Sequence, residues 1–189
     1  MTTQQVLSLA AVFLNKQELL PLIEQTQQPA DNIESKHYEL LLKSLNLCYQ
    51  EIALDYLPLL FKQQLLIQNN KIFIDDLQKQ PKDIYVISSL DQSKNYKFKV
   101  YDNYIDTNVN GNVNITYSYV PDELTITSDI NNFAGRISLK CLAMGTVAEF
   151  CYILGLYEDA ALWEQRYKSL LKIETRKKAD LKLPTRRWL

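Results

Sequence analysis

The sequence predicts an α+β protein: mainly an α-helical bundle with an inserted small antiparallel β domain and an extended C-terminal arm. Towards both ends of the chain apolar residues recur every three or four positions, which is the period of a helix. In the middle they alternate with polar residues, which is the period of a strand. From Arg176 onward, six basic side chains face one acid. We therefore expect the helical bundle over residues 1–62 and 123–178, the β domain over 63–122 and the arm over 179–189.

The stretch from Gly135 to Leu154 predicts a helix that is apolar on almost every face, and such a helix is normally buried. Its small residues Ala143, Gly145 and Ala148 would let neighbouring helices approach closely. Gly155 stands where a left-handed residue commonly ends a helix. This helix is expected to be the hydrophobic spine of the protein.

A second, amphipathic helix is predicted to begin near Glu158 and to run to about residue 178, and Asn131 or Asn132 is the expected N-cap of the first helix. The first helix approaches membrane-spanning length, but it contains Lys140 and Glu149. Each such charge costs about 2.5–3.5 kcal/mol at the centre of a bilayer. We therefore expect no membrane contact.

The N-terminal third predicts further helices. A helical region covers Thr3 to Gln25, with Pro21 in the first turn of a second short helix. Residues 27–31 form a linker, and a long amphipathic helix follows from Ile33 to Tyr56. Pro58 ends that helix, because proline cannot continue the backbone hydrogen bonding.

The middle of the chain predicts five strands. Their alternation indicates a sheet with one solvated face. Asn69–Asn70 would turn a hairpin between the first two strands, and Asn110–Gly111 is the strongest turn signal of the chain. The predicted strands are centred on Leu65–Ile67, Ile72–Ile74, Ile84–Ser88, Tyr96–Val100 and Val113–Tyr119.

Composition excludes several classes of protein. The formal net charge is −1, whereas a dedicated nucleic-acid binder normally carries a clear basic excess. The cysteines are Cys48, Cys141 and Cys151, of which two lie on one predicted helix, so a disulfide framework is not expected. The N-terminus lacks a signal-peptide pattern, which indicates a reducing interior or export as part of a larger assembly.

Residues that could carry catalysis are sparse. The single histidine, His37, could pair with Cys141 or Cys151, but both thiols belong to the most apolar helix and are expected to be inert. His37 itself is expected at the surface or near a helix start. The spacing of Cys, His and acidic residues predicts no metal site, and four scattered glycines form no phosphate-binding loop. The sequence leaves open a hydrolytic site made of two carboxylates, although no feature selects a particular pair. We therefore expect a protein that is not an enzyme and that binds neither a cofactor nor a metal ion.

Six of the twelve tyrosines fall in the predicted β domain and allow two interpretations. Aromatic side chains on sheets stack on single-stranded nucleic acid when a basic groove accompanies them. The predicted β domain is slightly acid-rich, which favours packing in the core or at an interface. These tyrosines are Tyr85, Tyr96, Tyr101, Tyr104, Tyr117 and Tyr119.

The end of the chain predicts a docking arm. Tryptophan and arginine dominate protein interfaces, and here they stand together behind a proline that blocks helix formation. The other interpretation is a basic tail that is simply solvated. The expected partner-binding residues are Leu183, Pro184, Arg186, Arg187, Trp188 and Leu189.

The order of these parts resembles a known family, the head-tail connector (adaptor) proteins of tailed bacteriophages and prophages. Three stretches carry the resemblance: the opening Val6-Leu-Ser-Leu-Ala-Ala-Val-Phe-Leu, the strands from Ile84 to Pro121, and Ala148-Glu-Phe-Cys-Tyr-Ile-Leu-Gly-Leu-Tyr-Glu-Asp-Ala-Ala-Leu-Trp ahead of Pro184-Thr-Arg-Arg-Trp. These motifs are architectural, and none of them is catalytic.

The resemblance implies a virion structural protein that forms a dodecameric ring beneath the portal protein, in the neck or tail of the virion, after assembly in the host cytoplasm. The arm would dock on the portal, the β domain would face the next tail or neck protein, and DNA would pass through the ring without specific contacts. Exposed apolar residues of the amphipathic helices, and Trp163, are the candidates for contacts between subunits. The alternative is a non-viral helical interaction module with a basic docking arm.

Overall fold

The computed structural model describes residues 1–29, 32–130, 133 and 135–176. The α-helices are α1 (Thr3–Phe13), α2 (Leu20–Ile23), α3 (Asn32–Glu51), α4 (Leu139–Ile153) and α5 (Tyr157–Thr175). The strands are β1 (Leu60–Ile67), β2 (Lys71–Phe73), β3 (Pro81–Ser88), β4 (Asn95–Tyr96), β5 (Phe98–Val100), β6 (Tyr104–Thr107) and β7 (Gly111–Tyr119). Short helical turns are η1 (Gln17–Leu19), η2 (Ile52–Tyr56) and η3 (Ile74–Asp76).

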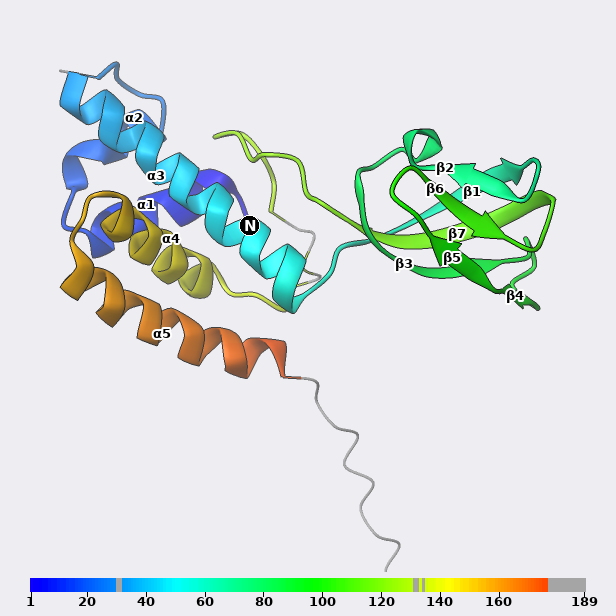
Figure 1. Cartoon of the computed structure of the whole chain (residues 1–189). Coiled ribbons are helices and arrows are strands. Elements are labelled where there is room, and N and C mark those ends of the chain that lie inside the picture. Colours follow the sequence, from blue (N-terminus) through cyan, green and yellow to red (C-terminus); the bar gives the residue numbers. More distant parts are fainter. Residues whose placement is uncertain (30–31, 131–132, 134, 177–189) are drawn as a thin grey trace, which may run out of the picture.

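The predicted α+β class is confirmed. Helices from the two ends of the chain pack beside one another, and the antiparallel strands between them in sequence gather on one side (Figure 1). The helical core and the core of the strands are two separate clusters of buried residues. Strand β1 begins at Leu60, ahead of residue 63, where the sequence indicated the change from helix to strand.

Local sequence accounts for the ends of the helices. Thr2 caps α1 in a capping box, in which the Thr2 hydroxyl accepts from the Gln5 backbone and the Gln5 side chain accepts from the Thr2 backbone. At the end of α4, Gly155 has φ of +75°, and Leu156 N donates to Cys151 O at 2.9 Å. This is a Schellman motif, and it confirms the predicted role of Gly155.

Helix α3 follows the prediction for residues 33–56 closely. It continues into η2, a π-helical turn in which Leu57 N donates to Ile52 O at 2.8 Å, and the helical backbone ends at Tyr56. Pro21 lies in the first turn of α2, as predicted. The buried positions of the long helix form a single stripe: Leu41, Ser44, Leu45, Cys48, Tyr49, Ile52 and Ala53.

Helix α4 lies at the centre of the helices and packs against α1, α3 and α5 (Figure 1). It begins later than predicted, at Leu139, because the Ser138 hydroxyl accepts from Cys141 N at 3.1 Å and caps it there. Asn131 and Asn132, the predicted caps, lie outside the described residues.

Gly145 lets three helices meet. A Cβ atom at this position would lie 2.3 Å from Cys48 Sγ on α3 and 2.9 Å from Tyr167 Cε2 on α5. Both distances are shorter than real Cβ contacts, so only glycine fits between these two side chains. The predicted role of small residues in α4 is therefore confirmed at this position.

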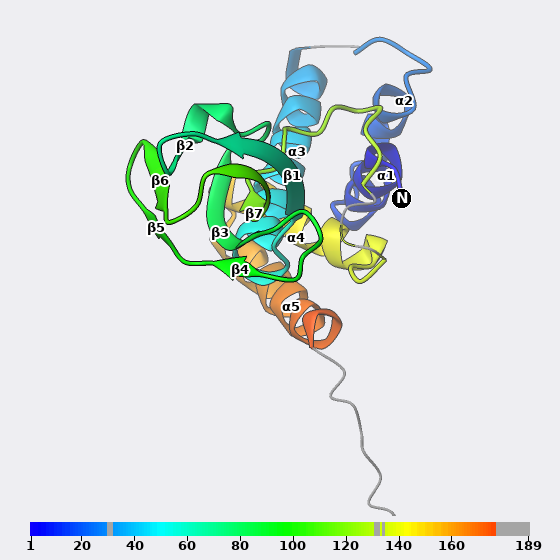
Figure 2. The same ribbon diagram turned by 90° about the vertical axis from the view of Figure 1, so that its right-hand side faces the viewer.

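The strands form two antiparallel sheets, with strand orders β1-β7-β3-β4 and β2-β6-β5 (Figure 2). Strand β7 is central in the larger sheet, and eight of its residues pair with β1 from Leu60↔Ser118 to Ile67↔Gly111. The two sheets enclose a small apolar core made of Ile67, Ile72, Leu77, Ile87, Ile105, Val113, Ile115 and Tyr117.

Two predictions about strand pairing are wrong. Asn69 and Asn70 do form a turn, with φ of +54° and +59°, and Gln68 bridges to Lys71 across it. Beyond that single bridge, β1 and β2 enter different sheets and the predicted hairpin does not continue. The predicted single strand Tyr96–Val100 divides at Lys97 into β4 and β5, which also belong to different sheets. Strand β6 was not predicted. Strand partners depend on long-range packing, which a local pattern does not encode.

The predicted solvated face is also wrong for β7. Asn114 and Ser118 alternate with the apolar residues of this strand, yet both are buried. The loop after β3 covers Asn114, whose Nδ2 donates to Ser89 O at 3.2 Å and to Leu90 O at 3.1 Å. The hydrogen bonds replace those that water would make, so a polar side chain is accommodated inside.

Replacing Gly145 by alanine is expected to destabilise the protein by about 1–3 kcal/mol, because the new methyl group overlaps side chains on two neighbouring helices. Urea denaturation followed by circular dichroism measures the loss. Cys48→Ala removes the nearer of the two atoms, so the double variant should lose less stability than the two single variants together. If the loss of stability in the double variant equalled the sum of the two single losses, the close contact would be contradicted.

Candidate assembly surface

The predicted docking residues Leu183, Pro184, Arg186, Arg187, Trp188 and Leu189 lie outside the described residues. Helix α5, which precedes them in the chain, is described to its end.

Helix α5 is anchored to its neighbours along its length. Tyr167 and Leu171 are buried, and Tyr167 Oη donates to Glu51 Oε2 on α3 at 3.0 Å. Near the end of α5, Glu174 Oε2 accepts from Ser138 N at 2.9 Å. This contact joins the end of α5 to the start of α4, so the chain reaches Arg176 from a fixed position.

Trp163, predicted as a candidate for subunit contacts, already has partners within the chain. Its ring stacks on Phe13 with centroids 5.2 Å apart, and the Arg166 guanidinium lies 5.0 Å from the ring centre. The side chain is half-buried. Trp163 therefore fixes α5 against the end of α1.

A run of exposed apolar side chains surrounds the turn between α4 and α5. Tyr152, Ile153, Leu154, Leu156 and Tyr157, here called the hairpin patch, are all exposed, and Tyr157 is 69% exposed. Scattered exposed apolar residues are normal, but a continuous group of them is typical of a protein interface. The sequence placed Tyr152 to Leu154 within a buried helix, so this surface was missed.

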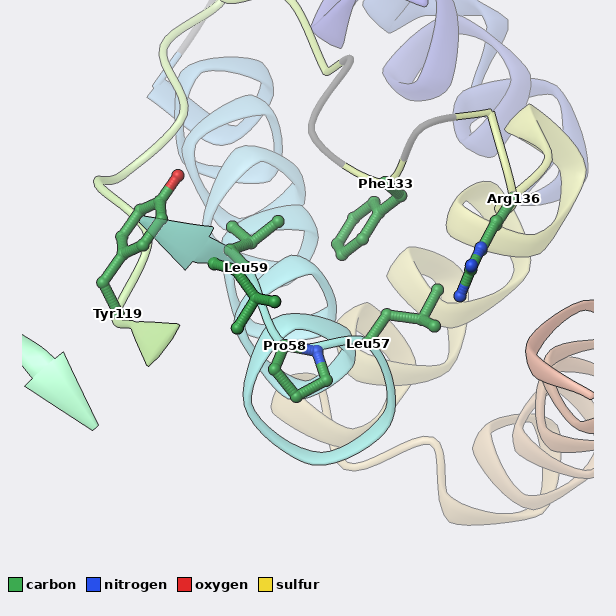
Figure 3. Close-up of a pocket in the computed structure, with 7 residues that line it drawn as sticks. Leu57, Pro58, Leu59, Tyr119, Phe133 and Arg136 are labelled. Atoms are coloured by element: carbon green, nitrogen blue, oxygen red, sulfur yellow. The ribbon is translucent and has the colours of Figure 1, made fainter. Parts of the chain in front are cut away.

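A cavity of about 420 Å³ lies where the chain leaves the helices for the strands. Leu57, Leu59 and Phe133 gather at its centre, with Tyr119 and Arg136 on opposite sides (Figure 3). Most of the lining residues are apolar, and Arg136 is the cation among them. An acid and a base do not converge there, so the cavity has the character of a contact surface more than of a catalytic cleft.

The thiols offer no activated nucleophile. Burial raises the pKa of Cys48, Cys141 and Cys151, which keeps each of them protonated and unreactive. His37 lies near the start of α3, which agrees with the expected position near a helix start, and it is half-buried. It packs edge-on to Phe150, and its Nδ1 lies 3.4 Å from Lys16 Nζ.

Within the described ranges, no group of three or more His, Cys, Asp or Glu side chains is arranged to hold a metal ion. Among the same residues, none of the helices combines the length and apolarity needed to cross a bilayer.

The strand tyrosines are used mainly in packing. Tyr117 is buried, and its hydroxyl donates to Gln63 Oε1 at 3.1 Å. Tyr101 and Tyr104 stack on each other with centroids 4.8 Å apart. Tyr85 is exposed on β3. Tyr101, Tyr104 and Tyr117 are thus engaged with their own chain, which supports the interpretation as packing residues.

Three carboxylates approach one another between α3, α4 and α5. Burial, and then the negative charges of Glu51 and Glu164, raise the pKa of Glu149. Lys168 forms an ion pair with Glu164 at 2.5 Å and offsets part of this repulsion. Tyr152 Oη donates to the same Glu164 carboxylate. The hairpin patch is thus attached to a charged network on one side.

Replacing Glu149 by glutamine is expected to raise the melting temperature at pH 7. A glutamate whose pKa is raised by folding destabilises the folded state once pH exceeds the unfolded pKa, about 4.3, and the penalty is complete above the folded pKa. Glutamine removes this penalty. The difference between the variant and the parent should vanish near pH 4, as measured by thermal melts across pH. A gain that is independent of pH would contradict the electrostatic cause.

Comparison with known proteins does not identify a family. No protein-family model matches the chain, and no curated protein matches it.

Proposed function

We propose that this protein is a head-tail connector of a tailed bacteriophage or prophage: a structural subunit, without catalytic activity, that joins a portal ring to the tail. The observation that carries the proposal is the hairpin patch, an exposed apolar surface at one end of the rigid α4–α5 pair, whose second helix leads into the Arg-Arg-Trp arm. A subunit of a ring needs such surfaces for its neighbours and for the ring above it.

The proposal includes a finer description of the fold. Residues 1–62 and 123–178 would form a helical bundle, residues 63–122 an inserted antiparallel β domain, and residues 179–189 the arm. The two separate buried clusters support this division, since one contains helical residues from both ends of the chain and the other contains strand residues. Each domain would then carry its own contacts in the assembly.

Ring formation requires two different surfaces on each subunit, because a closed ring is built from head-to-tail contacts. The hairpin patch would supply one of them. Burying an aromatic residue such as Tyr157 would contribute strongly, as aromatic residues commonly dominate interface energies. The family resemblance gives twelve as the number of subunits.

The partners follow from the same resemblance. The arm would bind the portal protein, and the strands would contact the next tail or neck protein. DNA would pass through the ring without specific contacts, and a net charge of −1 suits a channel that does not hold DNA. The protein would act in the neck of the virion after assembly in the host cytoplasm.

Replacing Arg186, Arg187 and Trp188 by alanine is expected to abolish binding to the portal ring, because these side chains would provide the charge-assisted and aromatic contacts of the arm. Pull-down with the portal protein of the same genome, followed by native mass spectrometry, measures this. The control K177A/K178A removes two positive charges and keeps the arm. Equal loss in both variants would indicate a general charge effect and contradict a specific arm.

Replacing Tyr157 by glutamate is expected to weaken assembly into rings at least about tenfold, which is a loss of about 1.4 kcal/mol per contact. A charge cannot be buried in an apolar interface without penalty. Lys172→Glu serves as the matched control, because it places a glutamate at an exposed polar position near the other end of α5. Sedimentation velocity with the portal ring measures assembly. Normal rings with Tyr157→Glu would exclude the hairpin patch as the subunit contact.

The alternative is a helical interaction module outside any virus, which would use the same arm for a single partner. Genes for a portal, a terminase and a capsid protein beside the coding gene would support the connector. Their absence, together with failure to form rings on any portal, would overturn the connector proposal.

A further inference from the structure

One of the outer strands of the two sheets differs from the others in length. Strands β1 and β4 bound the larger sheet, and β2 and β5 bound the smaller one. Strand β4 has two residues, and β2 and β5 have three each, whereas β1 has eight. Short outer strands protect a protein against pairing with another chain, because they present few unpaired backbone groups. Strand β1 lacks this protection.

The backbone of β1 directs alternate residues towards β7 and away from it. Tyr119 N donates to Leu59 O at 3.1 Å, so the odd-numbered residues of β1 turn their backbone groups to β7. The even-numbered residues therefore direct their N–H and C=O groups to the outer side. These residues, here called the β1 edge, are Leu60, Lys62, Gln64 and Leu66.

The β1 edge is open to solvent. Gln68 bridges to Lys71 just after the strand, but β2 then pairs with β6 and leaves β1. Among the residues that the structure describes, no backbone hydrogen bond links the β1 edge to another segment. All its side chains are exposed, with Leu60 at 58% and Leu66 at 61%. A cavity of about 600 Å³ among the strands lies at β4–β5, on the opposite side of the larger sheet, and does not involve this edge.

The side chains of the β1 edge specify what an added strand must carry. Strand addition obtains affinity from backbone hydrogen bonds and specificity from alternate side chains. The edge has an exposed leucine at each end, one lysine, and no proline that would interrupt pairing. A matching strand therefore needs apolar residues opposite both ends and a residue other than a cation opposite Lys62.

We propose that the β1 edge pairs with the β1 edge of a second copy of this chain, as antiparallel strands related by a two-fold axis at Gln63. Leu60 then lies opposite Leu66 of the partner subunit, and Lys62 lies opposite Gln64 of the partner subunit. Each such pair exchanges two backbone hydrogen bonds. The same residues serve both copies, as an isologous contact requires. This inference does not depend on the connector role.

Charge and backbone groups select this register over its neighbours. A shift of the axis to Lys62 places the two lysines directly opposite each other, which is destabilising. A shift to Gln64 places Leu60 opposite Gln68, whose C=O group already accepts from Lys71 N at 3.2 Å. In the proposed register the lysines are diagonal neighbours about 7–8 Å apart. Both remain in solvent, where salt screens their repulsion.

The helices leave room for this pairing. Strand β1 begins at Leu60, where the chain leaves the helices, and runs away from them (Figure 1). In an antiparallel pair the start of one β1 lies beside the end of the other. The helices of the two copies therefore lie at opposite ends of the paired strands, and the two larger sheets join into one.

The C-terminal stretch 177–189 is a less suitable occupant of the β1 edge. Its alternating residues Leu181 and Leu183 enclose Lys182, and the whole stretch is basic. It would add positive charge beside Lys62, whereas a second copy places the neutral Gln64 there.

The test is sedimentation equilibrium of the full-length protein in the absence of a portal, together with hydrogen exchange. A dimer with a Kd of about 100 μM is expected, because one pair of edge strands is a small interface. The amides of Lys62 and Gln64 should exchange more slowly as the protein concentration rises. A protein that is still monomeric at about 1 mM would overturn the proposal.

Two substitutions of the exposed Gln64 test the register. Gln64→Glu places a carboxylate opposite Lys62 of the partner subunit and should tighten the dimer about fivefold, whereas Gln64→Lys should weaken it by about the same factor. Both positions are in solvent, so the melting temperature of the monomer should hardly change. Gln165→Glu and Gln165→Lys make the same charge changes at an exposed position of α5 and should leave the dimer unchanged. Equal effects at the two positions would indicate a net-charge effect and overturn the pairing.

Two further variants distinguish the other possible contacts. Lys182→Pro prevents strand pairing by the C-terminal stretch and should leave the dimer unchanged. Protection of the β1 edge that is independent of concentration, and that Lys182→Pro removes, would identify that stretch as the occupant and overturn a second copy. Tyr157→Glu, which changes the hairpin patch, should also dimerise normally. Loss of the dimer in Tyr157→Glu would place the contact on the helices and overturn pairing through β1.

Discussion

The close crossing of three helices at Gly145 is the constraint on which the helical part depends. Cys48 on α3 and Tyr167 on α5 both approach this backbone so closely that a single methyl group would overlap them. Because both side chains contact α4 at this one residue, the crossing fixes the positions of α3 and α5 together. Tyr167 then reaches Glu51, and the end of α5 is tied to the start of α4 through Glu174. The apolar hairpin patch is thus held on a rigid support.

Burial inside the helices and exposure at their end are consequences of the same apolar stretch. From Cys141 to Cys151 nearly every residue of α4 is buried, whereas the residues from Tyr152 to Tyr157 are exposed. The difference arises because the surrounding helices stop covering α4 at its last turn, and because the Schellman motif at Gly155 reverses the chain there. An apolar surface that remains exposed on a rigid helical pair is suited to contact another molecule.

The candidate sites differ in how far the sequence predicts them. The arm was recognised from residue types alone, since arginine and tryptophan beside a proline are typical of interfaces, and it lies outside the described residues. The hairpin patch was not recognised, because Ile153 and Leu154 continue an apolar pattern whose burial depends on neighbouring helices. The cavity among the strands was not recognised either. Its walls come from β4–β5 and from the end of β6, a strand that was not predicted.

The sequence by itself determined the α+β class, the long helix to Tyr56, the turn at Asn69–Asn70 and the end of α4 at Gly155, because each depends on local periodicity or on a residue's own backbone preference. Only the tertiary structure decided which strands pair, where Tyr96–Val100 divides, and that Asn114 is buried. Strand partners lie far apart in the chain, and their choice depends on how two sheets close over one small core. A periodic pattern carries the direction of each side chain but not the identity of the residue that it meets.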